Sequence, residues 1–135
     1  MHLQWNDELL TGIENIDHHH KELFRITNRF LKACEEGKSK DKMVDLLRFL
    51  EAYVTEHFSA EEDLMKLHYY TDYTAHQEVH ADFSKKFTDL KQLLNHGDNL
   101  YVSLRLYDIL NTWLIQHIGT FDKALCIFLI TIKQA

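Results

Sequence analysis

Histidine is unusually frequent in this sequence, with ten in 135 residues. His57 stands four residues before Glu61, and His76 stands four residues before His80. In a helix this spacing brings the two side chains of each pair to one face. Neutral imidazole and carboxylate are ligands that suit iron, zinc and manganese. The two pairs therefore indicate a metal-binding site.

Apolar residues at helical spacing adjoin both pairs. Leu50 and Val54 lead into His57, and Phe83 and Phe87 follow the histidine pair of the later segment. Both pairs are therefore predicted to point into the protein interior. Isolated charges buried there would cost several kcal/mol each, and a bound metal is the natural compensation for a group of them.

Three adjacent histidines offer one more candidate ligand near the N-terminus. Only His20 continues the apolar face that runs through Ile16 and Leu23. His18 falls on the predicted solvent face, and His19 falls at the boundary between the two faces. His20 is therefore the predicted ligand of the three.

The last segment supplies His117 on its apolar face, with Asp122 five residues later. At about 100° per residue, a regular α-helix would not align these two side chains. A single π-type turn around Gly119 and Thr120 would align them, because its i→i+5 spacing adds one residue to the turn. The sequence thus predicts a π turn at this point.

The predicted metal ligands are His20, His57, Glu61, His76, His80, His117 and Asp122. If the metals are two octahedral irons, five imidazoles and two bridging carboxylates fill nine of twelve coordination positions. A bridging oxide or hydroxide fills two more, and one position stays open. A single open position fits O2 better than a bulky substrate.

The walls expected around that open position are apolar and offer few groups for acid–base chemistry. They are predicted to be Leu23, Phe58, Trp113, Leu114 and Ile118. For Leu23, Phe58 and Trp113, simple packing in the protein core is at least as good an explanation, and the two roles are compatible.

These side chains must be carried by long helices, because the sequence has no proline and only four glycines. Amphipathic helices are predicted over about 17–36, 41–66, 75–96 and 100–132, after an N-terminal arm over 1–15. Short connections make consecutive helices antiparallel neighbours. The expected fold is all-α, an up-down-up-down four-helix bundle forming a single domain over 1–135.

Composition limits the cellular setting. A net charge of −6 argues against a nucleic-acid partner, and two cysteines are too few for a disulfide framework. No secretory segment is visible, and the apolar run 125–132 is far shorter than the ~20 residues of a membrane span. We expect a cytoplasmic protein, monomeric or weakly homo-oligomeric, with no membrane partner.

At the level of motifs the sequence resembles the hemerythrins, specifically the stand-alone bacterial members, over nearly the whole chain. One motif alone would be weak, but the ordered set is specific. The matching positions are Trp5, Gly12, Ile16-Asp17-x-x-His20-Lys21, His57-Phe58-x-x-Glu61-Glu62-x-x-Met65, His76-x-x-x-His80-x-x-Phe83 and Trp113-x-x-x-His117-Ile118-x-x-x-Asp122. In one departure, His19 replaces the glutamine common before the first ligand.

The resemblance implies two iron ions bridged by an oxide or hydroxide and by Glu61 and Asp122. It implies that one iron is held by His20 and His57, and that O2 binds this iron. The second iron would be held by the remaining three histidines, His76, His80 and His117. The implied function is reversible O2 binding for transport, storage or sensing, and not enzymatic catalysis.

Two other functions remain open on the sequence. One is a di-iron enzyme with oxidase, peroxidase or nitric-oxide-handling activity. The ferritin-like oxidases build their sites with Glu-x-x-His pairs, which this sequence lacks. The other is a module whose site holds zinc for a structural purpose.

Overall fold

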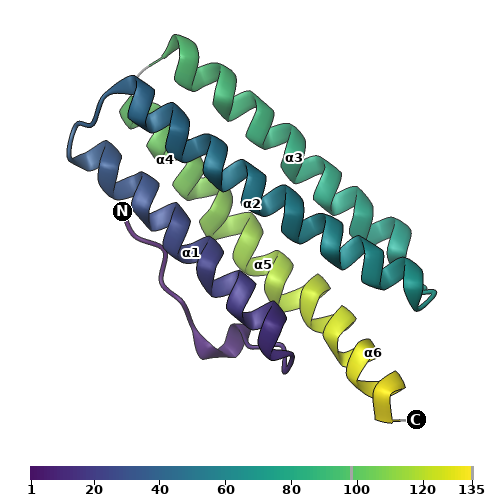
Figure 1. Cartoon of the computed structure of the whole chain (residues 1–135). Helices are drawn as coiled ribbons and strands as arrows, with labels where there is room; N and C mark the ends of the chain where they lie inside the picture. The colour runs from purple at the N-terminus through teal and green to yellow at the C-terminus, as the bar shows by residue number, and fades with distance from the viewer. Residues whose placement is uncertain (98, 135) are drawn as a thin grey trace.

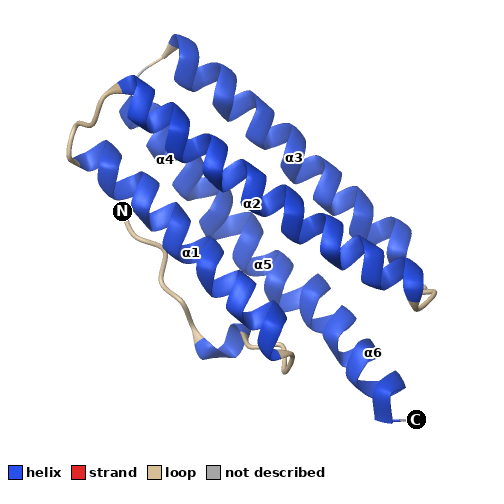
Figure 2. Ribbon diagram, in the orientation of Figure 1, coloured by secondary structure: helices blue, strands red, loops and turns tan. Residues whose placement is uncertain are grey.

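Long helices make up most of the chain. The computed structural model describes residues 1–97 and 99–134; residues 98 and 135, which belong to the predicted single domain, lie outside the described residues. Figures 1 and 2 show antiparallel helices joined by short loops, and no strand occurs among the described residues. The prediction of an all-α, up-down-up-down four-helix bundle is confirmed. The first three long helices are α1 (Glu14–Glu35), α2 (Lys40–Leu67) and α3 (Tyr73–His96).

The fourth long helix is built from consecutive helical segments of two kinds. It contains α4 (Asn99–Ile109), the π segment η2 (Leu110–Leu114), α5 (Ile115–His117), the π segment η3 (Ile118–Asp122) and α6 (Lys123–Gln134). The helix α1 packs against α2 and α4, and α3 packs against the same two helices. A short 3-10 helix, η1 (Asp7–Leu9), lies in the N-terminal arm.

The first helix begins earlier than the predicted start at residue 17, and the N-terminal arm is correspondingly shorter. The reason is the role of Asp17, which is buried. Its carboxylate accepts hydrogen bonds from the Thr11 backbone N–H at 2.8 Å and from the Thr11 hydroxyl at 2.7 Å. Asp17 thus ties the arm to the helix from within its first turns, and the helix starts at Glu14. The other predicted helix ends lie within a few residues of those observed.

The π turn predicted around Gly119 and Thr120 is confirmed as η3. The second π segment, η2, was not predicted. A π turn changes the phase of the residues that follow it. Around η3 that change is visible because His117 and Asp122 must share a face. Around η2 an apolar side chain points inward with or without the extra residue of a π turn. The hydrophobic pattern therefore does not show that the extra residue is present.

The bundle interior is divided along its length into an apolar half and a polar half. The apolar half is formed by the C-terminal part of α1, the N-terminal part of α2, the C-terminal part of α3 and α4. Nine of its apolar side chains are at most 1% exposed, and full burial stabilises by roughly 1.5–3 kcal/mol per side chain. They are Phe30, Leu31, Met43, Leu47, Leu50, Leu90, Leu94, Val102 and Leu106.

The C-terminal end of the fourth helix carries many apolar residues on both its faces. Leu125 and Cys126 are fully buried, whereas Ile127 is 62% exposed. By length and composition alone, the 35-residue helix Asn99–Lys133 could cross a membrane. That is weak evidence for a span, since a helix in the core of a soluble bundle meets the same criteria, and this helix buries His117 and Asp122 against its neighbours.

Candidate metal centre

The polar half of the interior gathers all seven of the predicted ligand side chains. Each of the four long helices contributes at least one of them, and none is more than 5% exposed. They are His20 on α1, His57 and Glu61 on α2, His76 and His80 on α3, and His117 and Asp122 on the fourth helix.

The seven side chains form two overlapping groups that share both carboxylates. In each group the potential ligand atoms lie within 4.8 Å of one another. One group contains Glu61, His76, His80, His117 and Asp122, and the other contains His20, His57, Glu61 and Asp122. Two positions with shared carboxylates are the arrangement expected for a pair of bridged metal ions.

Asp122 lies between the two groups. Its Oδ2 is 3.0 Å from Nε2 of His20, which belongs to one group. Its Oδ1 is 3.0 Å from Nε2 of His76 and 3.0 Å from Nε2 of His117, which belong to the other. Each oxygen of this carboxylate therefore faces a different group, as a bridging ligand requires. The π segment η3 makes this possible by turning Asp122 to the same face as His117.

Glu61 lies at the centre of the cluster but is not satisfied by its neighbours. Its Oε1 is 3.3 Å from Nε2 of His80 and 3.7 Å from Nε2 of His57. Neither carboxylate oxygen makes a hydrogen bond within the described part of the chain. Nδ1 of His20 and both ring nitrogens of His57 also lack hydrogen-bond partners among the described residues. Buried polar atoms are normally paired, so this set of lone pairs fits a site for cations.

The electrostatics of the cluster keep the imidazoles of His57 and His80 neutral. Burial, with help from neighbouring histidines, lowers the pKa of His57 to about 3 and that of His80 to about 2. Burial and the adjacent Asp122 raise the pKa of Glu61 well above its ordinary value. Burial opposes ionisation of Asp122 too, but hydrogen bonds from the imidazoles around it hold its pKa well below its ordinary value. Neutral imidazole is the form that binds metal.

The three adjacent histidines of α1 differ in burial as the apolar pattern indicates. His20 is fully buried, His18 is exposed and His19 is half-buried. The His19 ring lies edge-on to His57 at 5.6 Å between centroids and 6.2 Å from the ring of Tyr53. His19 is not a member of either ligand group among the described residues.

The side chains expected as pocket walls are apolar and mostly buried. Phe58 stacks on His80 with 3.8 Å between ring centroids, and Trp113 stacks on His117 at 4.5 Å. The other three, Leu23, Leu114 and Ile118, are at most 2% exposed. A surface hollow of about 240 Å³ beside Trp113 reaches His117 from outside the bundle.

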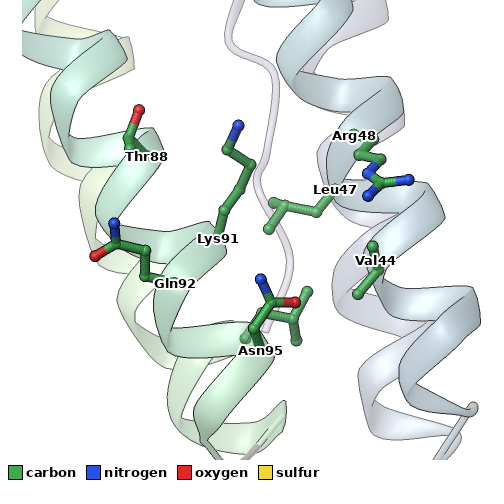
Figure 3. Close-up of a pocket in the computed structure, with 8 residues that line it drawn as sticks. Val44, Leu47, Arg48, Thr88, Lys91, Gln92 and Asn95 are labelled. Atoms are coloured by element: carbon green, nitrogen blue, oxygen red, sulfur yellow. The ribbon is translucent and has the colours of Figure 1, made fainter.

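A separate hollow lies between α2 and α3 at the apolar half of the bundle (Figure 3). Its volume is about 320 Å³. On α2 the lining residue nearest the seven side chains is Arg48, which lies nine residues before His57, ~14 Å away along the helix axis. The hollow is therefore remote from the seven side chains. Its labelled walls are Val44, Leu47 and Arg48 on α2 and Thr88, Lys91, Gln92 and Asn95 on α3.

Comparison with known families agrees with this geometry. The model of the hemerythrin HHE cation binding domain matches residues 11–125, which include all seven side chains. The chain belongs to the hemerythrin family. Membership places it in a class of non-haem iron proteins that bind O2.

Individual hemerythrins align over most of their length. A bacteriohemerythrin of Pseudomonas aeruginosa is 31% identical over 121 residues, covering 90% of this chain and 77% of the relative. A bacteriohemerythrin of Clostridium acetobutylicum is 31% identical over 123 residues, covering 88% of this chain and 95% of the relative. A myohemerythrin of Sipunculus nudus is 25% identical over 118 residues, covering 87% of this chain and 86% of the relative.

One residue next to the site was not singled out from the sequence. Glu62 hydrogen-bonds to Nδ1 of His80 across the α2–α3 interface. A sequence cue was available, since Glu62 follows Glu61 directly and lies four residues after Phe58, which also contacts His80. The hemerythrin motif includes Glu62, but a role was assigned to Glu61 alone.

Proposed function

We propose that this hemerythrin binds O2 reversibly at a di-iron centre and serves as an O2 carrier, store or sensor. The observation that carries the proposal is the pair of buried ligand groups that share Glu61 and Asp122. On this proposal His76, His80 and His117 hold one iron, and His20 and His57 hold the other. The two irons, when bound, supply the O2-binding position and the electrons that O2 takes up.

The protein's own residues contribute a dry and rigid surrounding. Phe58 and Trp113 cover two of the ligand histidines by ring stacking, and Leu23 is fully buried. We propose that these side chains, with Leu114 and Ile118, exclude water and proton donors from the O2 position. Restricted access to protons favours release of O2 over its further reduction.

The experiment that tests the proposal is O2 titration of the ferrous protein, followed by visible spectroscopy and then by degassing. We expect two irons per chain, one O2 per iron pair, and a spectrum that returns to the starting state after degassing. Rapid irreversible oxidation with turnover of peroxide or nitric oxide would overturn the proposal in favour of a di-iron enzyme. Two zinc ions per chain after expression in iron-replete medium would overturn it in favour of a structural site.

We further propose that the protein is cytoplasmic and either monomeric or weakly self-associating. The support is its low cysteine content and its net charge of −6. Cell fractionation and sedimentation of the purified holoprotein test both points. Recovery with membranes, or a stable oligomer at micromolar concentration, would contradict them.

A further inference from the structure

The five buried histidines of the cluster differ in what their outer ring nitrogen contacts. Among the residues that the structure describes, Nδ1 of His20, His57, His76 and His117 has no hydrogen-bond partner. Nδ1 of His80 lies 2.9 Å from Oε2 of Glu62, in hydrogen-bond geometry. His80 is thus singled out within the cluster by a carboxylate that is not itself one of the seven side chains.

Two residues of α2 hold the His80 ring from different directions. Phe58 stacks on its face, with 3.8 Å between centroids and 6° between the ring planes. The carboxylate of Glu62 lies at the edge of the ring, in hydrogen-bond contact with Nδ1. Phe58 and Glu62 are four residues apart, so both lie on the face of α2 that meets α3. Together they fix the plane and the edge of a ring carried by a different helix.

The two consecutive glutamates of α2 therefore have different neighbours. Glu61 is 1% exposed and points into the cluster. Glu62 is turned about 100° around the helix, and its side chain remains 22% exposed. Its carboxylate thus links the buried imidazole to the solvent-facing side of the α2–α3 interface.

We infer that Glu62 is a positioning residue, which holds His80 in the Nδ1–H tautomer and directs the Nε2 lone pair toward the metal. A carboxylate that accepts a hydrogen bond from the outer nitrogen of a ligand histidine fixes its tautomer and orientation and raises its basicity. The inference rests on the proposed metal centre, but not on the binding of O2. It makes the three-histidine group asymmetric, because only one of its imidazoles has this support.

The test combines three variants with two measurements. Glu62→Ala removes the acceptor, Glu62→Gln keeps an acceptor but removes the charge, and Asp63→Asn removes a neighbouring exposed charge as a matched control. Nitrogen NMR of the histidine rings in the metal-free protein reports the tautomer of His80. Cobalt(II) titration reports metal affinity, and the shifted exchangeable Nδ1–H signals of the cobalt protein report each ligand histidine separately.

We expect His80 to be mainly the Nδ1–H tautomer in the wild type and in Asp63→Asn, and to lose this preference in Glu62→Ala. Cobalt affinity should fall about 10- to 100-fold in Glu62→Ala and less in Glu62→Gln. One Nδ1–H signal should shift and exchange faster, while the other four stay unchanged.

Unchanged tautomer, affinity and exchange in Glu62→Ala would overturn the role of Glu62 and leave the metal centre intact. Equal changes in all five signals, with loss of helix content, would show a purely structural role and also overturn it. Failure of the wild type to bind cobalt would instead overturn the proposed centre itself. The Glu62→Gln variant keeps the test valid if Glu62→Ala does not fold.

Discussion

At the scale of single residues, the requirements of metal binding and of stability conflict most clearly at Glu61. Its side chain is buried, its oxygens lack hydrogen bonds, and burial together with Asp122 raises its pKa. A buried, unsatisfied carboxyl destabilises a fold, and replacing such groups with apolar residues of similar volume is often stabilising. The Glu61 carboxylate therefore stabilises the protein only when a cation is bound to it.

The first prediction concerns Glu61→Leu. In the metal-free protein, we expect this variant to increase the free energy of unfolding by about 1–4 kcal/mol, because it removes a buried polar group without leaving a cavity. Metal binding should fall below two ions per chain, because both ligand groups lose a shared carboxylate. Denaturant unfolding and metal analysis measure the two effects. The exposed Glu56→Leu is the control, and a destabilised Glu61→Leu protein would contradict the prediction.

The second prediction concerns the pH dependence of the metal-free protein. Below pH 6.5 the unfolded chain protonates its histidines, whereas folded His57 and His80 resist protonation down to a pKa of about 3 and about 2. The unfolded state therefore binds more protons, and the free energy of unfolding falls as pH falls. The raised pKa of Glu61 acts in the opposite sense and offsets part of the change.

Two histidines against one glutamate leave about one net proton, equivalent to ~1.4 kcal/mol per pH unit, between about pH 5.5 and 4.5. Denaturant unfolding at several pH values after chelation measures this slope. His57→Gln should reduce the slope by about one proton, and the control His18→Gln, at an exposed position, should leave it unchanged. A flat profile between about pH 6 and 4.5 would contradict the argument.

At the scale of the helices, the sequence predicted those features that continue or interrupt the hydrophobic pattern. His20 was identified because it continues an apolar stripe that His18 does not. The π turn at η3 was identified because two polar residues five apart had to share a face. The π segment η2 could not be predicted in this way, because the residues around it are apolar on several faces of the helix. The spacing of Glu62 from Phe58 shows which face of α2 it lies on, but it does not show that the partner on α3 is His80.

The third prediction compares Gly119, which lies within the fourth helix, with Gly12, which lies in the N-terminal arm against that helix. A Cβ at Gly119, within η3, would meet only Leu9 at 4.0 Å, so the π turn does not depend on a missing side chain there. Gly119→Ala should therefore keep metal binding and raise the free energy of unfolding by about 0.5–1 kcal/mol. Gly12 has φ of +91°, and its added Cβ would lie 3.1 Å from Ile130. Gly12→Ala should destabilise the protein.

Thermal or denaturant unfolding of the two glycine variants, with metal analysis beside it, measures the difference. Loss of metal from Gly119→Ala would mean that η3 needs the flexibility of glycine. A Gly12→Ala protein as stable as the wild type would mean that the arm adjusts freely around α6.

At the scale of the whole molecule, the division of the interior into two halves separates folding from metal binding. The apolar half contains side chains such as Phe30, Met43 and Leu94, which are buried and have no polar group that needs a hydrogen bond. The other half contains seven ligand-type side chains, several with unpaired atoms. Because each long helix runs through both halves, the apolar half can hold the four helices together while the metal centre is empty or filled (Figure 1).

The fourth prediction is that chelation loosens one half of the bundle and spares the other. Without metal, amide hydrogen exchange should accelerate around His20, Glu61, His80 and His117, where neutralisation of the carboxylates is lost. Exchange should change little around Leu47, because that half is closed by apolar burial. Each bound metal ion should add stability as RT ln(1 + [metal]/Kd), about 4 kcal/mol per site at a thousandfold excess over Kd. Mass-spectrometric exchange before and after chelation, with a Glu61→Leu protein as a control that no longer needs the cation, measures the contrast. Uniform loss of protection along all four helices would mean that the two halves unfold as one unit, and that the metal centre is required for the fold itself.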